Sequence, residues 1–119
     1  MKPIVTVLTP VYNGLHYLRD SIQSILDQSY KEFEFLIIDD ASTDEKVIEC
    51  IESFNDPRIR FIRNKENLGV SKTMNKAISL IKTPYIIRSD QDDVNCPNRV
   101  KDQLSFLIKN PDISVICSW

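Results

Sequence analysis

Five aspartates of the 119-residue sequence fall into two groups, and each group closely follows a short apolar segment. Asp39 and Asp40 form the first group, and Asp90, Asp92 and Asp93 form the second. Carboxylates crowded in this way raise one another's pKa values unless a cation joins them. Oxygen ligands without a neighbouring His or Cys are typical of Mg²⁺ or Mn²⁺ sites rather than zinc sites. The grouping therefore predicts a divalent cation that holds the phosphates of a nucleotide.

Helix capping is the alternative interpretation of the same residues. Ser42, Thr43 and Asp44 are assigned to the cap of the helix that follows them. The second acidic group could likewise be a solvated loop before a helix, where acids favour the helix dipole. Asp40 is the better functional candidate of its pair, because a carboxylate at a strand end can accept hydrogen bonds from a ribose hydroxyl or a base N–H.

Tyr12, Lys72 and Asn75 are further candidates for a nucleotide site. The ring of Tyr12 could stack on a base or cover the sheet edge. Lys72 lies in a turn into a helix, where its ammonium group could face an anion or solvent. Asn75 could brace a loop or face solvent. Arg88 and Arg99 flank the second acidic group, where an ion pair and a substrate contact are equally compatible with the sequence.

Short β-branched runs alternate with segments of helical period, which predicts an α/β fold with a Rossmann-like, mainly parallel sheet and helices on both faces. The predicted strands are Ile4–Thr9, Phe33–Ile38, Ile59–Arg63, Tyr85–Arg88 and Ile113–Cys117. The apolar stripes of the predicted helices span Leu15–Leu26, Val47–Ile51, Val70–Ile81 and Val100–Ile108. Ligands of such sheets bind beyond the carboxyl ends of the strands, and both acidic groups lie there.

Composition excludes several classes of protein. The net charge of −2, with 15 basic and 17 acidic residues, offers no basic face for nucleic acid. Only two glycines occur, Gly14 and Gly69, which excludes the glycine-rich dinucleotide fingerprint and the P-loop. Three cysteines without a CxxC pair favour a reducing cytoplasm over a disulfide framework. The single histidine, His16, is expected at the surface, so a Ser-His-Asp triad has no support. No transmembrane segment is predicted.

The sequence resembles the amino-terminal half of family 2 glycosyltransferases with the GT-A fold. Seven pieces carry the resemblance in order along the chain: Val7–Asn13, Ser24–Tyr30, Phe33–Asp44, Asn67–Gly69, Lys72–Ile78, Asp90–Asp93 and Pro97–Val100. Each piece is short, and their joint order and spacing make the likeness specific. Gln91, Ser89 and Cys117 depart from the residues usual at their positions.

The resemblance implies transfer of a sugar from a nucleotide diphosphate, commonly a UDP-sugar, to a saccharide or lipid-linked acceptor in bacterial surface glycan synthesis. It assigns Pro10, Tyr12, Asp40, Lys72, Asn75 and Asp90 to nucleotide binding, and Asp92 and Asp93 to Mn²⁺ or Mg²⁺ in a DXD-type motif. Residues 1–119 are expected to be one nucleotide-sugar-binding domain of a longer, inverting enzyme whose catalytic base follows Trp119. We expect a cytoplasmic protein, with peripheral association at the inner membrane face left open.

Two other functions were compared with this interpretation. A signalling receiver domain has a similar length and an acidic pocket, but it would need acidic residues after the first strand, a phosphorylated Asp after the third and a Lys after the fifth. Tyr12–Asn13, Arg63–Asn64 and Ser118–Trp119 stand at those places. A non-catalytic nucleotide-binding module remains the stronger alternative.

Overall fold

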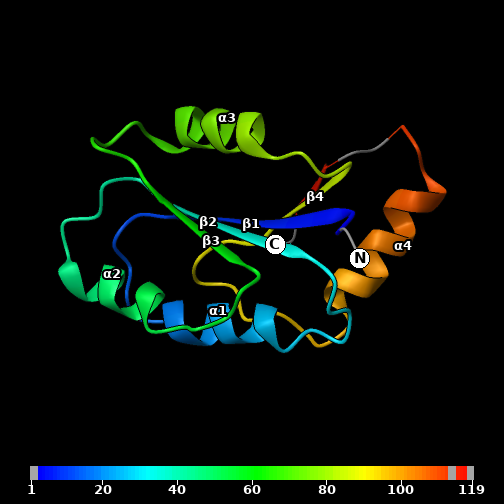
Figure 1. The fold of residues 1–119 in the computed structure, drawn as a ribbon, viewed down its shortest axis with the longest axis horizontal. Coiled ribbons are helices and arrows are strands. Elements are labelled where there is room, and N and C mark those ends of the chain that lie inside the picture. The colour runs from blue at the N-terminus through cyan, green and yellow to red at the C-terminus, as the bar shows by residue number, and fades with distance from the viewer. Residues whose placement is uncertain (1–2, 113–114, 118–119) are drawn as a thin grey trace.

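Five parallel strands form the sheet at the centre of the protein (Figure 1). A computed structural model describes residues 3–112 and 115–117. The strands are β1 (Val5–Val11), β2 (Glu34–Asp39), β3 (Ile59–Arg63), β4 (Tyr85–Arg88) and β5 (Val115–Cys117). Their order across the sheet is β3-β2-β1-β4-β5. The chain therefore moves outward from β1 in one direction to β3, and then crosses back to build the other side with β4 and β5.

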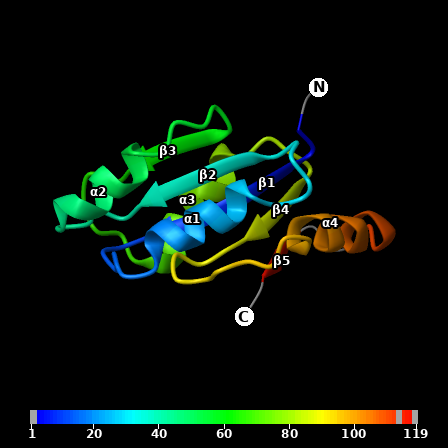
Figure 2. The ribbon, with the colours of Figure 1, turned by 90° about the horizontal axis from the view of Figure 1, so that it is seen from below.

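Four helices cover the two faces of this sheet: α1 (Leu18–Leu26), α2 (Glu45–Glu52), α3 (Val70–Leu80) and α4 (Arg99–Lys109). Side chains of α1, α2 and α4 share one apolar cluster with alternate residues of the central strands, such as Val7 and Phe35. The opposite face carries Leu8, Leu36 and Ala77 of α3 in a smaller cluster. Figures 1 and 2 show α3 alone on its side of the sheet, with α1 and α2 on the other. Alternation along each strand divides the apolar residues between the two layers.

The predicted Rossmann-like α/β fold is confirmed, and β3 and β4 have the predicted bounds. β1 is longer than predicted, because its pairing with β2 continues through Pro10 to Val11. Pro97 lies just before α4, which begins at Arg99, and its carbonyl accepts a hydrogen bond from the N–H of Ser29. Ile113, the expected start of the last strand, lies outside the described residues.

The predicted caps are confirmed in part. Asp44 is the N-cap of α2, and its carboxylate accepts a hydrogen bond from the N–H of Lys46. Ser42 instead contacts Asp39 within the preceding loop. His16 is exposed, as expected. In the part of the chain that is described, no helix has the length and apolar character needed to cross a membrane.

Candidate functional site

A cavity of about 200 Å³ opens at the carboxyl ends of β1 and β4, beside the start of α3. It is lined by Pro10, Val11, Tyr12, Asp40, Val70, Thr73, Arg88, Asp90, Gln91 and Asp92. The chain leaves β1 toward β2 on one side, whereas β4 lies on the other side. This is the switch point of the sheet, where the diverging connections leave an open crevice for a ligand.

Asp40 lines the cavity, and only 6% of its surface is exposed. One carboxylate oxygen accepts hydrogen bonds from the N–H of Leu68 at 2.8 Å and from Asn64 Nδ2 at 2.9 Å. The other accepts from the N–H of Gly69 at 2.9 Å. Burial alone would raise the pKa of this carboxyl, but these hydrogen bonds, together with the Thr73 hydroxyl, outweigh burial and lower it. Asp40 is therefore a fixed negative charge at the entrance to α3.

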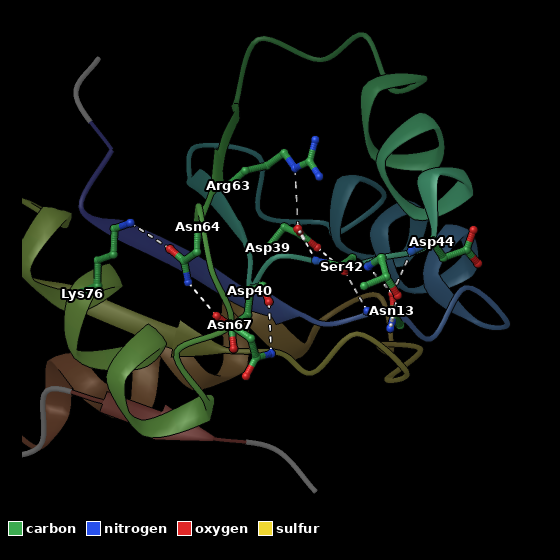
Figure 3. A network of polar contacts seen from close by, with 10 residues as sticks. Asn13, Asp39, Asp40, Ser42, Asp44, Arg63, Asn64, Asn67 and Lys76 are labelled. Atoms are coloured by element: carbon green, nitrogen blue, oxygen red, sulfur yellow. Dashed lines mark hydrogen bonds and ion pairs between the residues drawn. The ribbon is translucent and has the colours of Figure 1, made fainter.

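A chain of polar side chains extends from Asp40 to the surface of α3 (Figure 3). Asn64 is buried directly after β3, where it donates to Asp40 and to Thr73. Its side-chain oxygen, Oδ1, accepts a hydrogen bond from Lys76 Nζ at 2.8 Å. Asn67 donates to the backbone carbonyl of Asp40. These contacts fasten the start of α3 to the end of β2, so the wall formed by Val70 and Thr73 is held in place.

Asp39 lies one residue earlier and serves the opposite layer. Its carboxylate accepts from the backbone N–H of Ser42 at 3.0 Å and from the Ser42 hydroxyl, and Arg63 lies 3.7 Å away. Ser42 Oγ in turn accepts from the N–H of Asn13 at 2.7 Å. Asp39 thus fixes Ser42 in the loop before α2, and Ser42 in turn holds Asn13 in the loop after β1 (Figure 3).

The second acidic group forms a turn at the end of β4. Asp90 is paired with Arg88, whose Nε lies 2.9 Å from its carboxylate. The N–H of Asp93 donates to the carbonyl of Asp90, and a carboxylate oxygen of Asp93 accepts from the N–H of Asp90. Asp92 is exposed and lines the cavity. The turn therefore places Asp92 at the cavity, while the charge of Asp90 is partly offset by Arg88.

Two side chains of α1, together with Gln28 just after its end, hold this acidic turn and the segment that follows it. Ser21 donates to the carbonyl of Asp90 at 3.2 Å. Ser24 accepts from the N–H of Asn95 at 2.9 Å. Gln28 is fully buried, donates to the carbonyls of Ser24 and Cys96, and accepts from the N–H of Val100. Ser21, Ser24 and Gln28 therefore fix the backbone at several points of the connection between β4 and α4.

The acidic turn fits a divalent ion that arrives together with phosphate. Across the described residues, no three His, Cys, Asp or Glu side chains lie close enough together to hold a metal ion by themselves. Mg²⁺ commonly takes only one or two protein carboxylates and completes its shell with water and substrate phosphates. Asp92 at the cavity rim, with Asp93 beside it, matches that need in donor chemistry.

The structure brings Pro10, Tyr12, Asp40, Asp90 and Asp92 together around one cavity. Tyr12 is 47% exposed, which leaves much of its side chain accessible. By contrast, Lys72 and Asn75 are exposed on α3 and do not belong to the cavity lining, so their role in nucleotide binding stays a prediction.

Sequence reasoning missed Val70, Thr73 and Gln91 as lining residues and left the role of Arg88 open. The signal for Val70 and Thr73 was present in the sequence. They lie three residues apart at the start of a helix and therefore share one of its faces. Gln91 was noted only as a departure from the residue usual at its position.

Comparison with known proteins agrees with this geometry. The family model described as glycosyl transferase family 2 matches residues 6–119. A glycosyltransferase of Methanocaldococcus jannaschii is 38% identical over 121 residues, which cover 99% of this chain and 42% of the relative. A Bacillus subtilis glycosyltransferase named for teichuronic acid biosynthesis is 36% identical over 110 residues, covering 91% of this chain and 43% of that protein. The chain thus spans about two fifths of the length of these relatives.

Solved structures give the same result. The crystal structure of S. aureus TarS 1–349 in complex with UDP-GlcNAc matches with a TM-score of 0.78 and 25% identity, over 93% of this chain and 32% of that one. The mannosyltransferase PcManGT of Pyrobaculum calidifontis, in complex with GDP-Man and Mn²⁺, matches with a TM-score of 0.72 and 25% identity, over 92% and 32%. By its sequence, its sheet and its cavity, this chain belongs to glycosyl transferase family 2.

Proposed function

We propose that the chain forms the donor-binding part of an enzyme that transfers a sugar from a nucleotide diphosphate, with a UDP-sugar as donor, to a saccharide or lipid-linked acceptor. One observation carries the proposal. A single cavity has Tyr12 and Asp40 on the β1 and β2 side and Asp90 and Asp92 on the β4 side. An aromatic ring and a buried carboxylate suit a nucleoside, whereas exposed carboxylates suit a metal-bound diphosphate.

The roles of the individual side chains follow from this arrangement. We assign the nucleoside to Pro10, Tyr12 and Asp40, with Asp90, Lys72 and Asn75 toward the rest of the donor. Asp92 and Asp93 would hold Mn²⁺ or Mg²⁺. When bound, such an ion offsets the negative charge that develops on the departing diphosphate. The ion pair with Arg88 offsets the charge of Asp90, whereas Asp92 is exposed at the cavity.

An inverting transfer also needs a general base beside the acceptor hydroxyl. We assign no described residue to that role. Asp93 is the nearest candidate in the acidic turn, but its carboxylate accepts a hydrogen bond from the N–H of Asp90, which suits a structural and donor-binding role better. The proposal for these residues is therefore donor binding, and catalysis belongs to the complete protein.

Bacterial surface glycans, such as capsule, lipopolysaccharide or exopolysaccharide, are the products that we propose for the complete protein. The support is the relative named for teichuronic acid biosynthesis. We place the reaction in the cytoplasm, with the inner face of the membrane as the site where a lipid-linked acceptor would be met.

Isothermal calorimetry with UDP tests the proposal directly. The parent chain is titrated with Mn²⁺ present and again after chelation, beside Asp92→Ala and the control Asp102→Ala, an exposed aspartate in the first turn of α4. We expect Mn²⁺ to tighten UDP binding to the parent and the control, and Asp92→Ala to lose that gain. Failure of the parent to bind UDP would contradict the nucleotide site, and equal binding after chelation would contradict the metal.

A GDP titration of the same proteins addresses the choice of nucleotide, since one structural neighbour is a complex with GDP-Man. Tighter binding of GDP than of UDP would contradict the UDP-sugar assignment. Transfer from a UDP-sugar by the complete protein distinguishes an enzyme from a nucleotide-binding module, which would bind the nucleotide without turnover.

A further inference from the structure

Gln91 connects the two halves of the cavity. Its carboxamide oxygen accepts a hydrogen bond from the N–H of Tyr12 at 2.8 Å. Its carboxamide nitrogen donates to the carbonyl of Asn13 at 2.6 Å and to that of Gly14 at 3.0 Å. One side chain in the acidic turn therefore satisfies three backbone groups of the loop after β1, nearly 80 residues earlier in the chain. These contacts use both N–H donors of the carboxamide and one of the two acceptor sites of its oxygen.

Gly14 is shaped to receive this contact. A Cβ built on Gly14 would collide with Nε2 of Gln91, so any other residue at position 14 displaces the carboxamide. The φ of Gly14 is +67°, a left-handed conformation that glycine adopts without steric cost. Space and backbone geometry thus both require glycine where Gln91 crosses the loop.

The far side of the same loop is also fixed. Asn13 has a φ of +49°, and its side-chain oxygen accepts from the N–H groups of Thr43 and Asp44 before α2. Its own N–H donates to Ser42. The segment before α2 therefore holds the loop on one side, and the side chain of Gln91 holds it on the cavity side. Loss of Gln91 would free the cavity side and leave the other side anchored.

We infer that Gln91 is a positioning residue that locks the Tyr12 loop to the acidic turn, so that metal at Asp92 and nucleotide at Tyr12 bind cooperatively. The inference rests on the proposed function. Tyr12 and Asp92 both line the cavity. The backbone N–H of Tyr12 donates a hydrogen bond to the side chain of Gln91, which directly precedes Asp92. A ligand that orders the acidic turn thereby orders the loop that carries the ring, and the two binding free energies are linked.

The first measurement is independent of any ligand. Hydrogen exchange of the Tyr12 amide, followed by NMR in the 119-residue chain, reports the bond to Gln91 Oε1. We expect Gln91→Ala to speed this exchange. Gln23→Ala is the matched control, because Gln23 is an exposed glutamine whose side chain donates a hydrogen bond to Asp27, away from the loop after β1. Unchanged exchange of the Tyr12 amide in Gln91→Ala would overturn the lock.

The second measurement is the factor by which Mn²⁺ tightens UDP binding, obtained by calorimetry with the metal present and chelated. Each variant serves as its own reference, so a general loss of stability does not move the ratio while the protein stays folded. We expect the factor to fall about fivefold or more in Gln91→Ala, within the usual range of coupling between sites, and to stay at the parent value in Gln23→Ala.

The pair of Gly14→Ala and Gln91→Ala completes the test. Because Gly14→Ala both displaces the carboxamide and strains the left-handed backbone, we expect it to lower the coupling factor at least as much as Gln91→Ala, and the double variant to lower it no further than Gly14→Ala. Additive losses would overturn the inference. Coupling retained in Gln91→Ala would overturn it while leaving the proposed function standing. A parent that fails to bind UDP, or binds it without regard to Mn²⁺, would overturn the proposed function or its metal as well.

Discussion

Asp39 and Asp40 are adjacent in sequence, yet their carboxylates serve opposite layers of the protein. Asp39 accepts hydrogen bonds from Ser42 before α2, whereas Asp40 accepts from Leu68 and Gly69 at the start of α3. Successive residues of a strand point to opposite faces, so two acids at one strand end can each fasten a different helix. The end of β2 is therefore a junction that fixes both sides of the site.

Replacement of Asp40 by Asn should destabilise the protein in a pH-dependent manner. The folded-state pKa of Asp40 lies below its usual 3.8, so its charge contributes stability above that value, and the contribution is lost as the pH falls through the folded-state pKa. We expect Asp40→Asn to lower the unfolding free energy at pH 7 by about 1–3 kcal/mol, and by less near about pH 3. Urea unfolding at both pH values measures this, and an equal loss at both would contradict the role of the charge.

Ala41 lies between the two aspartates with a φ of +61°, which is unfavourable for a residue with a Cβ. Relief of that strain exceeds the extra chain entropy of glycine in the unfolded state, so Ala41→Gly should raise the unfolding free energy by about 0.5 kcal/mol. Ala41→Val should lower it, because a β-branched side chain tolerates this region least. Thermal and urea unfolding give the order Gly, Ala, Val; a valine variant as stable as the parent would refute it.

Gln28 should be among the least replaceable polar residues. Its carboxamide is fully buried and makes bonds of 3.0 Å, 2.7 Å and 2.9 Å to three backbone groups. Gln28→Leu leaves those groups unsatisfied, and we expect a loss of about 2–4 kcal/mol in the free energy of unfolding. Gln23→Leu at an exposed position of α1 is the control. Similar urea midpoints for the two variants would show that the buried bonds contribute little.

Arg88 should restrain the metal affinity of the acidic turn. Its guanidinium group neutralises Asp90, so Arg88→Met should make the binding of Mn²⁺ alone about two- to tenfold tighter, the range expected for one nearby charge at a partly exposed site. Arg60→Met, which removes a charge paired with Glu34 at 3.8 Å, is the control. Electron paramagnetic resonance of free Mn²⁺ measures the Mn²⁺ affinity of both variants. Weaker binding to Arg88→Met than to the parent would argue against this role.

The order of strands and helices could be predicted from sequence because apolar period and β-branched runs depend on local neighbours. β3 and β4 were predicted at their observed bounds for that reason. The cavity required more, because Asp40 and Asp92 meet only through the order of strands across the sheet. The direction of a side chain on a helix was harder still. Lys72 looked suited to an anion by type, but Val70 and Thr73 are the residues of α3 that face the cavity.

Gln91 shows a different limit of sequence reasoning. A glutamine by itself indicates no particular catalytic or binding role. The importance of Gln91 comes from its hydrogen bonds to three backbone groups that are distant in sequence. Backbone groups carry no signature in the sequence that would announce such partners. The conformation of Gly14 was equally hidden, although a lone glycine after a predicted strand is a reasonable place to look for one.

The central position of β1 has a consequence for the order of folding during synthesis. β1, β2 and β3 can pair once the chain has reached Arg63, but the other edge of β1 waits for Tyr85, which pairs with Val5. Pairings between residues so far apart in sequence form late, because closing a long loop is entropically unfavourable. The cavity, which needs both edges of β1, therefore forms only after β4 has joined the sheet, and a nascent chain acquires it only after residues up to Asp92 have left the ribosome.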